Sequence, residues 1–426
     1  MSSTKTKSRG SVRTETLNTV ALDLQDERLI AATGIGGAVR AFGRRVRGGE
    51  LGSLPVVVGL VVIWAVFGIL DPTFFSPFNL VNLTLQSAAT GTIAVGIVLV
   101  LLLGEIDLSV GSVSGLSAAI IGTLFVGAGW SIWLTILVAL AAGAAIGLLY
   151  GLLFTRFGVP AFVVTLAGLL AFLGVQLLVL GPDGSINIPF KSGIVQFASQ
   201  TFLPDWASYA LVVIAAAVYA LSLARRSQSR RRAGLSGMNA GGIALRAGAL
   251  LVLTGAVAVY LNQGRGIGAI FLVFIAVVVI ANYALTRTRW GRYLYAIGGN
   301  VEAARRAGIR VRSVYVSVFV LCSTLAALGG ILAAARLGAA SQQSGSGDTN
   351  LNAIAAAVIG GTSLFGGRGS AYSALLGIIV ITSISNGLNL LSLDSSVRYM
   401  ITGAVLVLAV IVDSLSRRSR AASGRG

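Results

Sequence analysis

The chain alternates between long apolar runs and short polar segments, and this pattern predicts twelve membrane-spanning helices. A bilayer core is about 30 Å thick, and a helix needs about 20 apolar residues to cross it. The runs approach this length and contain almost no charge. The expected spans are 54–70, 80–103, 110–128, 131–154, 161–180, 207–224, 247–262, 266–285, 313–337, 350–366, 371–391 and 398–414. The span at 350–366 is glycine-rich, so a re-entrant segment is a second interpretation of it.

The composition agrees with this pattern. Hydrophobic residues make up 55% of the chain and charged residues 11%, whereas soluble domains have about 45–50% and about 25%. In lipid, backbone polar groups must be satisfied within the protein, which favours helices. We therefore expect an all-α, polytopic membrane protein with about twelve helices, and ten at the least.

The net charge of +18 is concentrated between the apolar runs rather than within them. Nine lysines and arginines precede Ser53, and three later clusters contain six, seven and four of them. These clusters lie at 225–246, 287–312 and 417–425. Cytoplasmic loops carry such an excess of positive charge, and an even number of spans puts all four clusters on one side. The distribution argues against nucleic acid as a partner, although the net charge alone would suggest one.

We therefore expect a protein of the cytoplasmic membrane with both termini in the cytoplasm. A basic N-terminal tail at 1–53 precedes a membrane domain at 54–414, and a short basic tail follows at 415–426. Within the membrane domain, 225–246 and 286–312 are expected to be cytoplasmic loops. The N-terminal tail is too long and polar for the first part of a cleavable signal peptide, so the first span is expected to be retained.

Several kinds of chemistry are excluded by residue type. The chain has no histidine, and Cys322 is its single cysteine, which removes Ser-His-Asp triads, Cys-His nucleophiles and histidine metal sites. The spacing of Gly361 and Gly366 is that of a phosphate loop, but Gly367 and Arg368 stand where lysine and Ser/Thr are needed. We expect no enzymatic activity, no metal and no directly bound cofactor, so that any ATP hydrolysis belongs to another polypeptide.

Two carboxylates lie between apolar spans in the segment GEIDLSVGSVSG at 104–115. Ionisable groups at membrane depth are costly and mark function. Glu105 and Asp107 are nevertheless expected near the cytoplasmic end of the spans, where a carboxylate costs little. Asp107 or Ser109 could serve as the N-cap of the helix that starts near Val110. Capping and the lining of a pathway are compatible, because broken helices commonly border transporter cavities.

The basic loop at 286–312 contains a short amphipathic helix after Gly299 and Asn300. Glu302 can pair with arginines three and four residues later, and Gly308 is a helix stop. A helix with such small side chains suits docking in a groove of another protein. A solvated loop that only carries the orientation signal is the other interpretation.

Three segments together resemble one protein family. The sequence EIDLSVGS at 105–112, the pattern EAA-x3-G at 302–308 and VIGGTSL at 358–364 are similar to motifs of the permease subunits of bacterial sugar ABC importers of the ribose, xylose and arabinose type. The variant with Glu105 before Ile106 resembles the D-xylose permeases most. The similarity extends from about residue 54 to residue 418.

This resemblance implies a permease with a type II ABC importer-like fold that imports a monosaccharide, most of all D-xylose. The implied partners are an ATPase subunit that uses the ATP, an extracytoplasmic sugar-binding protein, a second permease copy and the membrane lipid. The implied ATPase-coupling residues are Gly299, Asn300, Glu302, Ala303, Ala304, Arg305 and Gly308. The implied signature and pathway residues are Glu105, Asp107, Ser109, Gly111 and Ser112.

Alternatives remain at three levels. The sugar could instead be ribose, arabinose or galactose, and branched-chain amino-acid permeases form a neighbouring family. An ion-coupled secondary transporter would need ionisable groups within its spans, and few are present. Asn82, Gln86 and Asn386 are candidates for a sugar pathway, but each could instead join helices by hydrogen bonds.

Overall fold

The computed structural model describes residues 54–404 apart from 236, 395 and 398, together with residues 407 and 411. Within these residues, nine helical segments are long and apolar enough to cross a membrane. They are α3 (Pro77–Leu102), α4 (Val110–Ile120) continued by the π-helix η3 (Ile121–Gly127), α5 (Ile132–Phe157), α6 (Ala161–Leu180), α8 (Asp205–Arg232), α9 (Ala240–Asn262), α10 (Ala269–Arg287), α13 (Val311–Leu337) and α15 (Ala371–Leu390). The expected all-α, polytopic membrane fold is confirmed.

The remaining elements are shorter. They are α2 (Leu54–Leu70), η2 (Pro72–Phe75), β1 (Ser185–Asn187), α7 (Gly193–Ser199), α11 (Arg289–Gly299), α12 (Val301–Arg306), β2 (Ala339–Ser341) and α14 (Gly347–Ile359). The helix expected at 350–366 is corrected: α14 begins earlier and ends at Ile359, because the glycine-rich stretch that follows forms a loop up to the start of α15. Most of the span expected at 398–414 and both terminal tails lie outside the described residues.

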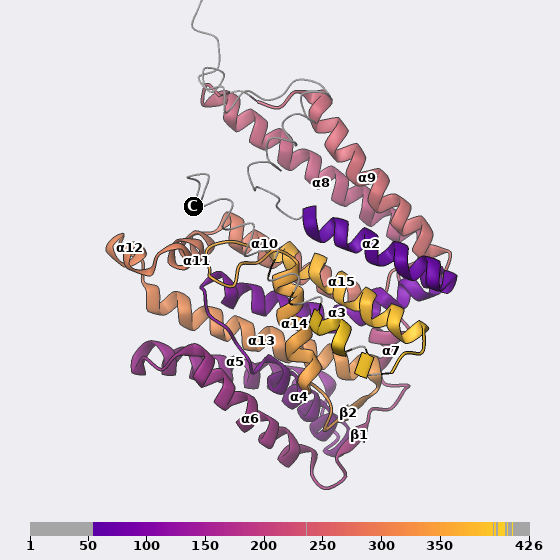
Figure 1. The fold of residues 1–426 in the computed structure, drawn as a ribbon, viewed down its shortest axis with the longest axis vertical. Coiled ribbons are helices and arrows are strands. Elements are labelled where there is room, and N and C mark those ends of the chain that lie inside the picture. The colour runs from indigo at the N-terminus through magenta and orange to yellow at the C-terminus, as the bar shows by residue number, and fades with distance from the viewer. Residues whose placement is uncertain are drawn as a thin grey trace, which may run out of the picture. The chain divides into compact units, whose positions relative to one another are not determined.

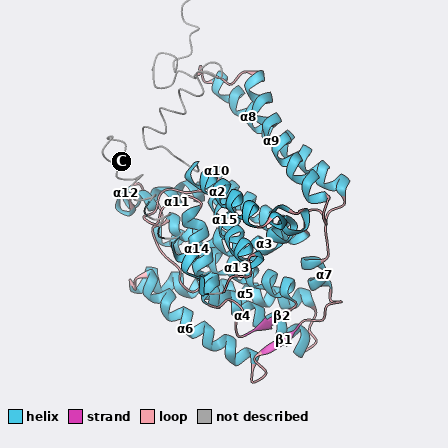
Figure 2. Ribbon diagram, turned by 45° about the vertical axis from the view of Figure 1, so that its right-hand side comes forward, coloured by secondary structure: helices cyan, strands magenta, loops and turns pink. Residues whose placement is uncertain are grey.

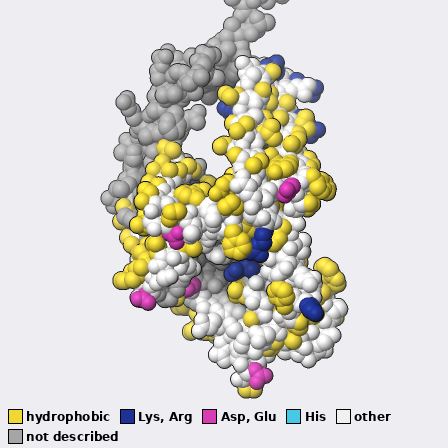
Figure 3. Space-filling model, turned by 90° about the vertical axis from the view of Figure 1, so that its right-hand side faces the viewer, with side chains coloured by type: hydrophobic (Ala, Val, Ile, Leu, Met, Phe, Trp, Pro, Cys, Tyr) yellow, Lys and Arg dark blue, Asp and Glu magenta, His cyan; other side chains and the backbone are white. Residues whose placement is uncertain are grey.

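The described residues form two compact units, and α8 and α9 make up the smaller one, at 206–259. Its turn is closed by Ser227 and Arg231, whose side chains donate hydrogen bonds to the Met238 carbonyl at 2.8 and 3.2 Å. Figure 3 shows basic side chains, all arginines in this part of the sequence, at one end of this hairpin and apolar side chains along its length. An apolar surface of this kind with a basic end is typical of lipid-facing helices.

In the larger unit α13 is the central helix, packed against α3, α4 and α5 (Figure 1). The contact with α5 depends on Gly143, Gly147 and Gly151, which face one side of that helix. A Cβ atom added to Gly143 or Gly151 would lie 2.7 Å from atoms of α13, including the Val316 Cα, and one on Gly147 would meet the Phe319 carbonyl. This is the close approach that small residues allow between membrane helices. These three glycines of α5 therefore serve the packing of helices within the chain.

The larger unit has two distinct ends, one at α12 and the other at the strands (Figures 1 and 2). At the first end, α12 leads directly into the start of α13. At the second, β1 pairs antiparallel with β2, with Ile186 opposite Ala340. Because α13 has 27 residues, the two ends are about 40 Å apart along its axis. We call them the α12 end and the strand end.

Candidate functional site: the glycine junction and the intramembrane cavity

The short helix expected after Asn300 is present as α12. The Asn300 side chain accepts a hydrogen bond from the Ala303 N–H at 2.9 Å and so caps the helix. Glu302 and Arg305 form an ion pair at 2.8 Å on its exposed surface. Ala304 is buried, whereas Ala303, like its charged neighbours, is exposed. The helix therefore presents a small-residue face bordered by charges.

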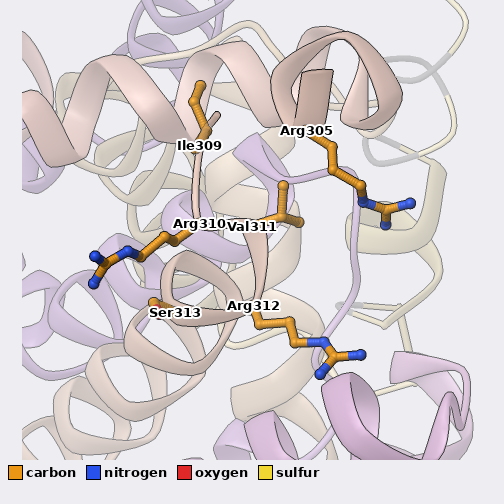
Figure 4. A pocket seen from close by; sticks show the side chains of 6 residues that line it. All are labelled: Arg305, Ile309, Arg310, Val311, Arg312 and Ser313. Carbon is orange, nitrogen blue, oxygen red and sulfur yellow. The ribbon is translucent and has the colours of Figure 1, made fainter. Parts of the chain in front are cut away.

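A cavity of about 640 Å³ adjoins α12, and we call it the basic cleft. It is lined by Arg305, Ile309, Arg310, Val311, Arg312 and Ser313. In Figure 4 the side chains of Arg305 and Arg312 extend toward the same side, and that of Arg310 extends away from them. The cleft is positively charged and suits an acidic protein surface.

Directly before α12, three segments that lie far apart in the sequence meet at what we call the glycine junction. A Cβ atom on Gly298 would collide with the Leu102 carbonyl and lie 2.6 Å from the Gly367 nitrogen. The Gly367 N–H donates to the same Leu102 carbonyl at 2.9 Å. Gly104, with φ of +83°, lies against the backbone of Phe365. The end of α11, the start of the non-helical segment at 104–109, which we call the signature segment, and the loop before α15 are therefore in backbone contact.

From this junction the signature segment runs into the bundle without helical structure. Residues 104–109 are not helical, and Asp107 and Ser109 are fully buried. Cys322, beside the Asp107 carboxyl, is eleven residues into α13, or about 16 Å from its start. The expectation that Asp107 lies near the end of the spans is therefore corrected. Non-helical backbone at such a depth is tolerated where protein surrounds it.

The capping prediction for this segment is also corrected in part. Asp107 accepts hydrogen bonds from the Ser109 N–H and hydroxyl at 2.8 and 2.7 Å. Ser109 is the N-cap residue of α4, but its side chain makes no capping bond. Instead the Gly111 N–H donates to the Asn350 side chain of α14. Asn350, more than two hundred positions away, thus accepts a hydrogen bond from a backbone N–H at the start of α4. This bond joins α4 to α14.

Glu105 lies beside the glycine junction, outside the spans. Its partial burial raises the pKa of its carboxyl from 4.5 to about 7, because desolvation disfavours the charged form. Glu105 therefore titrates near neutral pH, at the point where the three segments meet.

This shift predicts a pH-dependent stability. The folded protein holds the Glu105 proton more tightly than the unfolded chain, so the stabilisation is full below about pH 4.5 and is lost as the pH rises toward about 7. After allowance for solvent screening, the effect is on the order of 1 kcal/mol. The melting temperature of the purified protein should fall between pH 5 and 7.5 more steeply than that of Glu105→Gln. Parallel curves for the two proteins would contradict the prediction.

A second feature is a polar cavity of about 340 Å³ among α3, α13, α14 and α15, which we call the intramembrane cavity. It is lined by Gln86, Thr90, Arg336, Asn352, Ile378, Ile381, Thr382, Ser385 and Asn389. Arg336 is the next-to-last residue of α13. The cavity thus extends toward the strand end. A neighbouring cavity of about 350 Å³ shares Asn352 and Ser385 with it and also contains Asp348 and Tyr399.

The three residues suggested for a sugar pathway lie in different surroundings. Gln86 lines the intramembrane cavity. Asn386 exchanges two hydrogen bonds with Asn79, at 2.8 and 3.0 Å, and so joins α15 to α3. Asn82 accepts a hydrogen bond from Arg265 at 3.2 Å. Gln86 alone among the three thus borders a space that a solute could occupy.

Sequence reasoning missed most of the cavity. Asn352, Thr382 and Ser385 are single polar residues within apolar helices, and nothing in their neighbours distinguishes them from packing residues. Arg336 did carry a signal, because an arginine inside a predicted span is expected to face a cavity or a partner.

Comparisons with known proteins agree with the fold. Residues 79–410 match the protein family described as "Branched-chain amino acid transport system / permease component". The chain is 36% identical over 350 residues to the xylose transport system permease protein of Escherichia coli (strain K12), which covers 82% of this chain and 88% of that protein. The corresponding protein of Haemophilus influenzae is 34% identical over 366 residues, covering 85% and 96%.

The ribose import permease protein of Escherichia coli (strain K12) is 33% identical over 360 residues, covering 84% of this chain and 92% of that protein. No solved structure matches the chain. The family match spans most of the chain, and these similar proteins are permeases of sugar transport systems. The chain therefore belongs to this permease family and is a multi-pass inner-membrane permease of the sugar ABC importer type.

Proposed function

We propose that this protein forms the membrane pathway of an ATP-driven importer for D-xylose. Among the observations, the intramembrane cavity carries this proposal, because neutral amides and hydroxyls make up most of its lining. A pentose presents hydroxyl groups all around its ring, and side chains that both donate and accept hydrogen bonds match them. The similarity to xylose permeases of two organisms favours xylose over ribose.

The α12 end is then the cytoplasmic end, since the basic cleft and the arginine-rich loop lie there and positive charge favours the cytoplasmic side. An ATPase subunit would bind the exposed face of α12 around Glu302 and Ala303. An extracytoplasmic binding protein would deliver the sugar at the strand end. A second permease copy would complete the pathway.

A continuous series of contacts links the proposed ATPase-docking face of α12 to the intramembrane cavity. Movement of α12 would act through Gly298 on Leu102 directly, and through Gly366 on Gly104, where the signature segment begins. That segment leads into α4, whose start is bound to Asn350 of α14. Two residues later, Asn352 lines the cavity. Closure of the ATPases could in this way move a wall of the sugar pathway.

The experiment that tests the function is uptake of labelled D-xylose into proteoliposomes. They contain this protein with its ATPase subunit, ATP on the α12 side and the binding protein on the other side. We expect ATP-dependent uptake that unlabelled xylose competes away and ribose does not. Uptake of ribose alone would retain the importer and replace its substrate. Uptake that proceeds without ATP would refute the importer mechanism and favour an ion-coupled transporter.

A further inference from the structure

Among the described residues that line the intramembrane cavity, Arg336 alone carries a charge. It lies in the last turn of α13, inside a membrane-spanning helix. Within the described part of the chain no carboxylate forms an ion pair with it, and its Nε atom is buried without a hydrogen-bond partner. An arginine in such a position is tolerated where it faces a water-filled space. The cavity supplies that space.

No other described residue of the lining balances this charge. The other residues around the intramembrane cavity are amides, hydroxyls and isoleucines. Asp348 lines the neighbouring cavity, where it accepts a hydrogen bond from the Tyr399 hydroxyl at 3.0 Å. It is exposed in the first turn of α14. A solute that moves from the neighbouring cavity into the intramembrane cavity therefore meets a positive charge that no described residue of the lining compensates.

A pathway wide enough for a pentose is also wide enough for hydrated protons and small metal cations. A neutral sugar experiences little force from a fixed charge, whereas a cation is repelled strongly between walls of low dielectric constant. Positive groups in narrow pores exclude cations and protons by this means. A guanidinium can also donate hydrogen bonds to sugar hydroxyls, so its charge need not obstruct the substrate.

We propose that Arg336 is a cation barrier, which lets this permease move a neutral sugar without discharging the proton and sodium gradients across the membrane. The proposal rests on the proposed function in one respect, namely that the intramembrane cavity belongs to the transport pathway. It adds a second property to that pathway: the permeating solutes are neutral, and cationic ones such as amino sugars are rejected.

The test measures proton entry and sugar uptake in the same proteoliposomes. The permease and its ATPase subunit are reconstituted with a pH-sensitive dye inside, and a potassium gradient with valinomycin sets a potential that draws protons inward. With ATP and binding protein present, Arg336→Gln should admit protons at least fivefold faster than the wild type. Arg336→Lys keeps the positive charge, so its rate of proton entry should stay close to that of the wild type. Arg156→Gln removes an exposed arginine from the last turn of α5, outside both the intramembrane cavity and the basic cleft, and serves as the matched control.

A further variant separates charge from packing. Thr382 lines the same cavity from α15, so Thr382→Lys added to Arg336→Gln should return proton entry to within twofold of the wild-type rate. Equal proton entry in the wild type and Arg336→Gln would overturn the proposal, as would an Arg336→Lys variant as leaky as Arg336→Gln. Absence of sugar uptake in the wild type is a different result: it refutes the proposed function, whereas the comparison of proton entry between variants still decides the role of Arg336.

Discussion

Replacing Gly298 by alanine should reduce ATP-dependent uptake at least tenfold while the ATPase subunit stays bound. The added Cβ atom would occupy the position of the Leu102 carbonyl and lie 2.6 Å from the Gly367 nitrogen. Backbone atoms cannot rotate away as a flexible side chain can, so the junction must open, and overpacking of this kind costs about 1–3 kcal/mol. The contact of the end of α11 with Leu102 and the loop before α15 would then be lost. The measurement is uptake together with co-purification of the ATPase.

The neighbouring residue provides the control. A Cβ atom on Gly299 would have no atom within 4 Å, so Gly299→Ala changes the same helix end without entering the junction and should keep most of the uptake. Glu302→Lys acts on the exposed face of α12 instead and should release the ATPase subunit. Normal uptake by Gly298→Ala would show that the junction does not transmit movement. Release of the ATPase by Gly298→Ala would assign the glycine to docking.

The glycine junction also shows how far the sequence alone could lead. Each of its three segments is recognisable in the sequence, because glycines and polar residues interrupt apolar runs. Their meeting is not recognisable, since Leu102, Gly298 and Gly367 are held together by backbone contacts between residues that are far apart. Segments that lie in lipid are apolar, so hydropathy along the sequence locates most of the spans. It contains no information about which helix ends are in contact.

The same limit explains the errors at the two short helices. The run at 350–366 is as apolar as a span, but its Gly360 and Gly361 end α14 early. At α4, local rules pointed to Asp107 or Ser109 as the cap, whereas the acceptor comes from Asn350. Helix-cap patterns describe neighbours along the chain. In a bundle with buried helix starts, the partner is chosen by tertiary packing.

Replacing Asn350 by leucine should both destabilise the protein and abolish most of its uptake. Leucine has a similar volume but no acceptor, so the Gly111 N–H would be left buried without a partner, at a cost of about 1–3 kcal/mol. Asn350 itself is 8% exposed, and water cannot readily replace it. The start of α4 should loosen, and amide hydrogens in the first turn of that helix should exchange faster with deuterium.

Asn352→Leu is the matched control on the same helix. Asn352 lines the intramembrane cavity and makes no capping bond, so its loss should weaken uptake but leave the melting temperature and the exchange of α4 close to wild type. The two variants thus separate the anchoring of the broken helix from the lining of the pathway. If Asn350→Leu kept wild-type melting and exchange, α4 would not depend on α14, and the route from the glycine junction to the cavity would have to run through α3 or α13 instead.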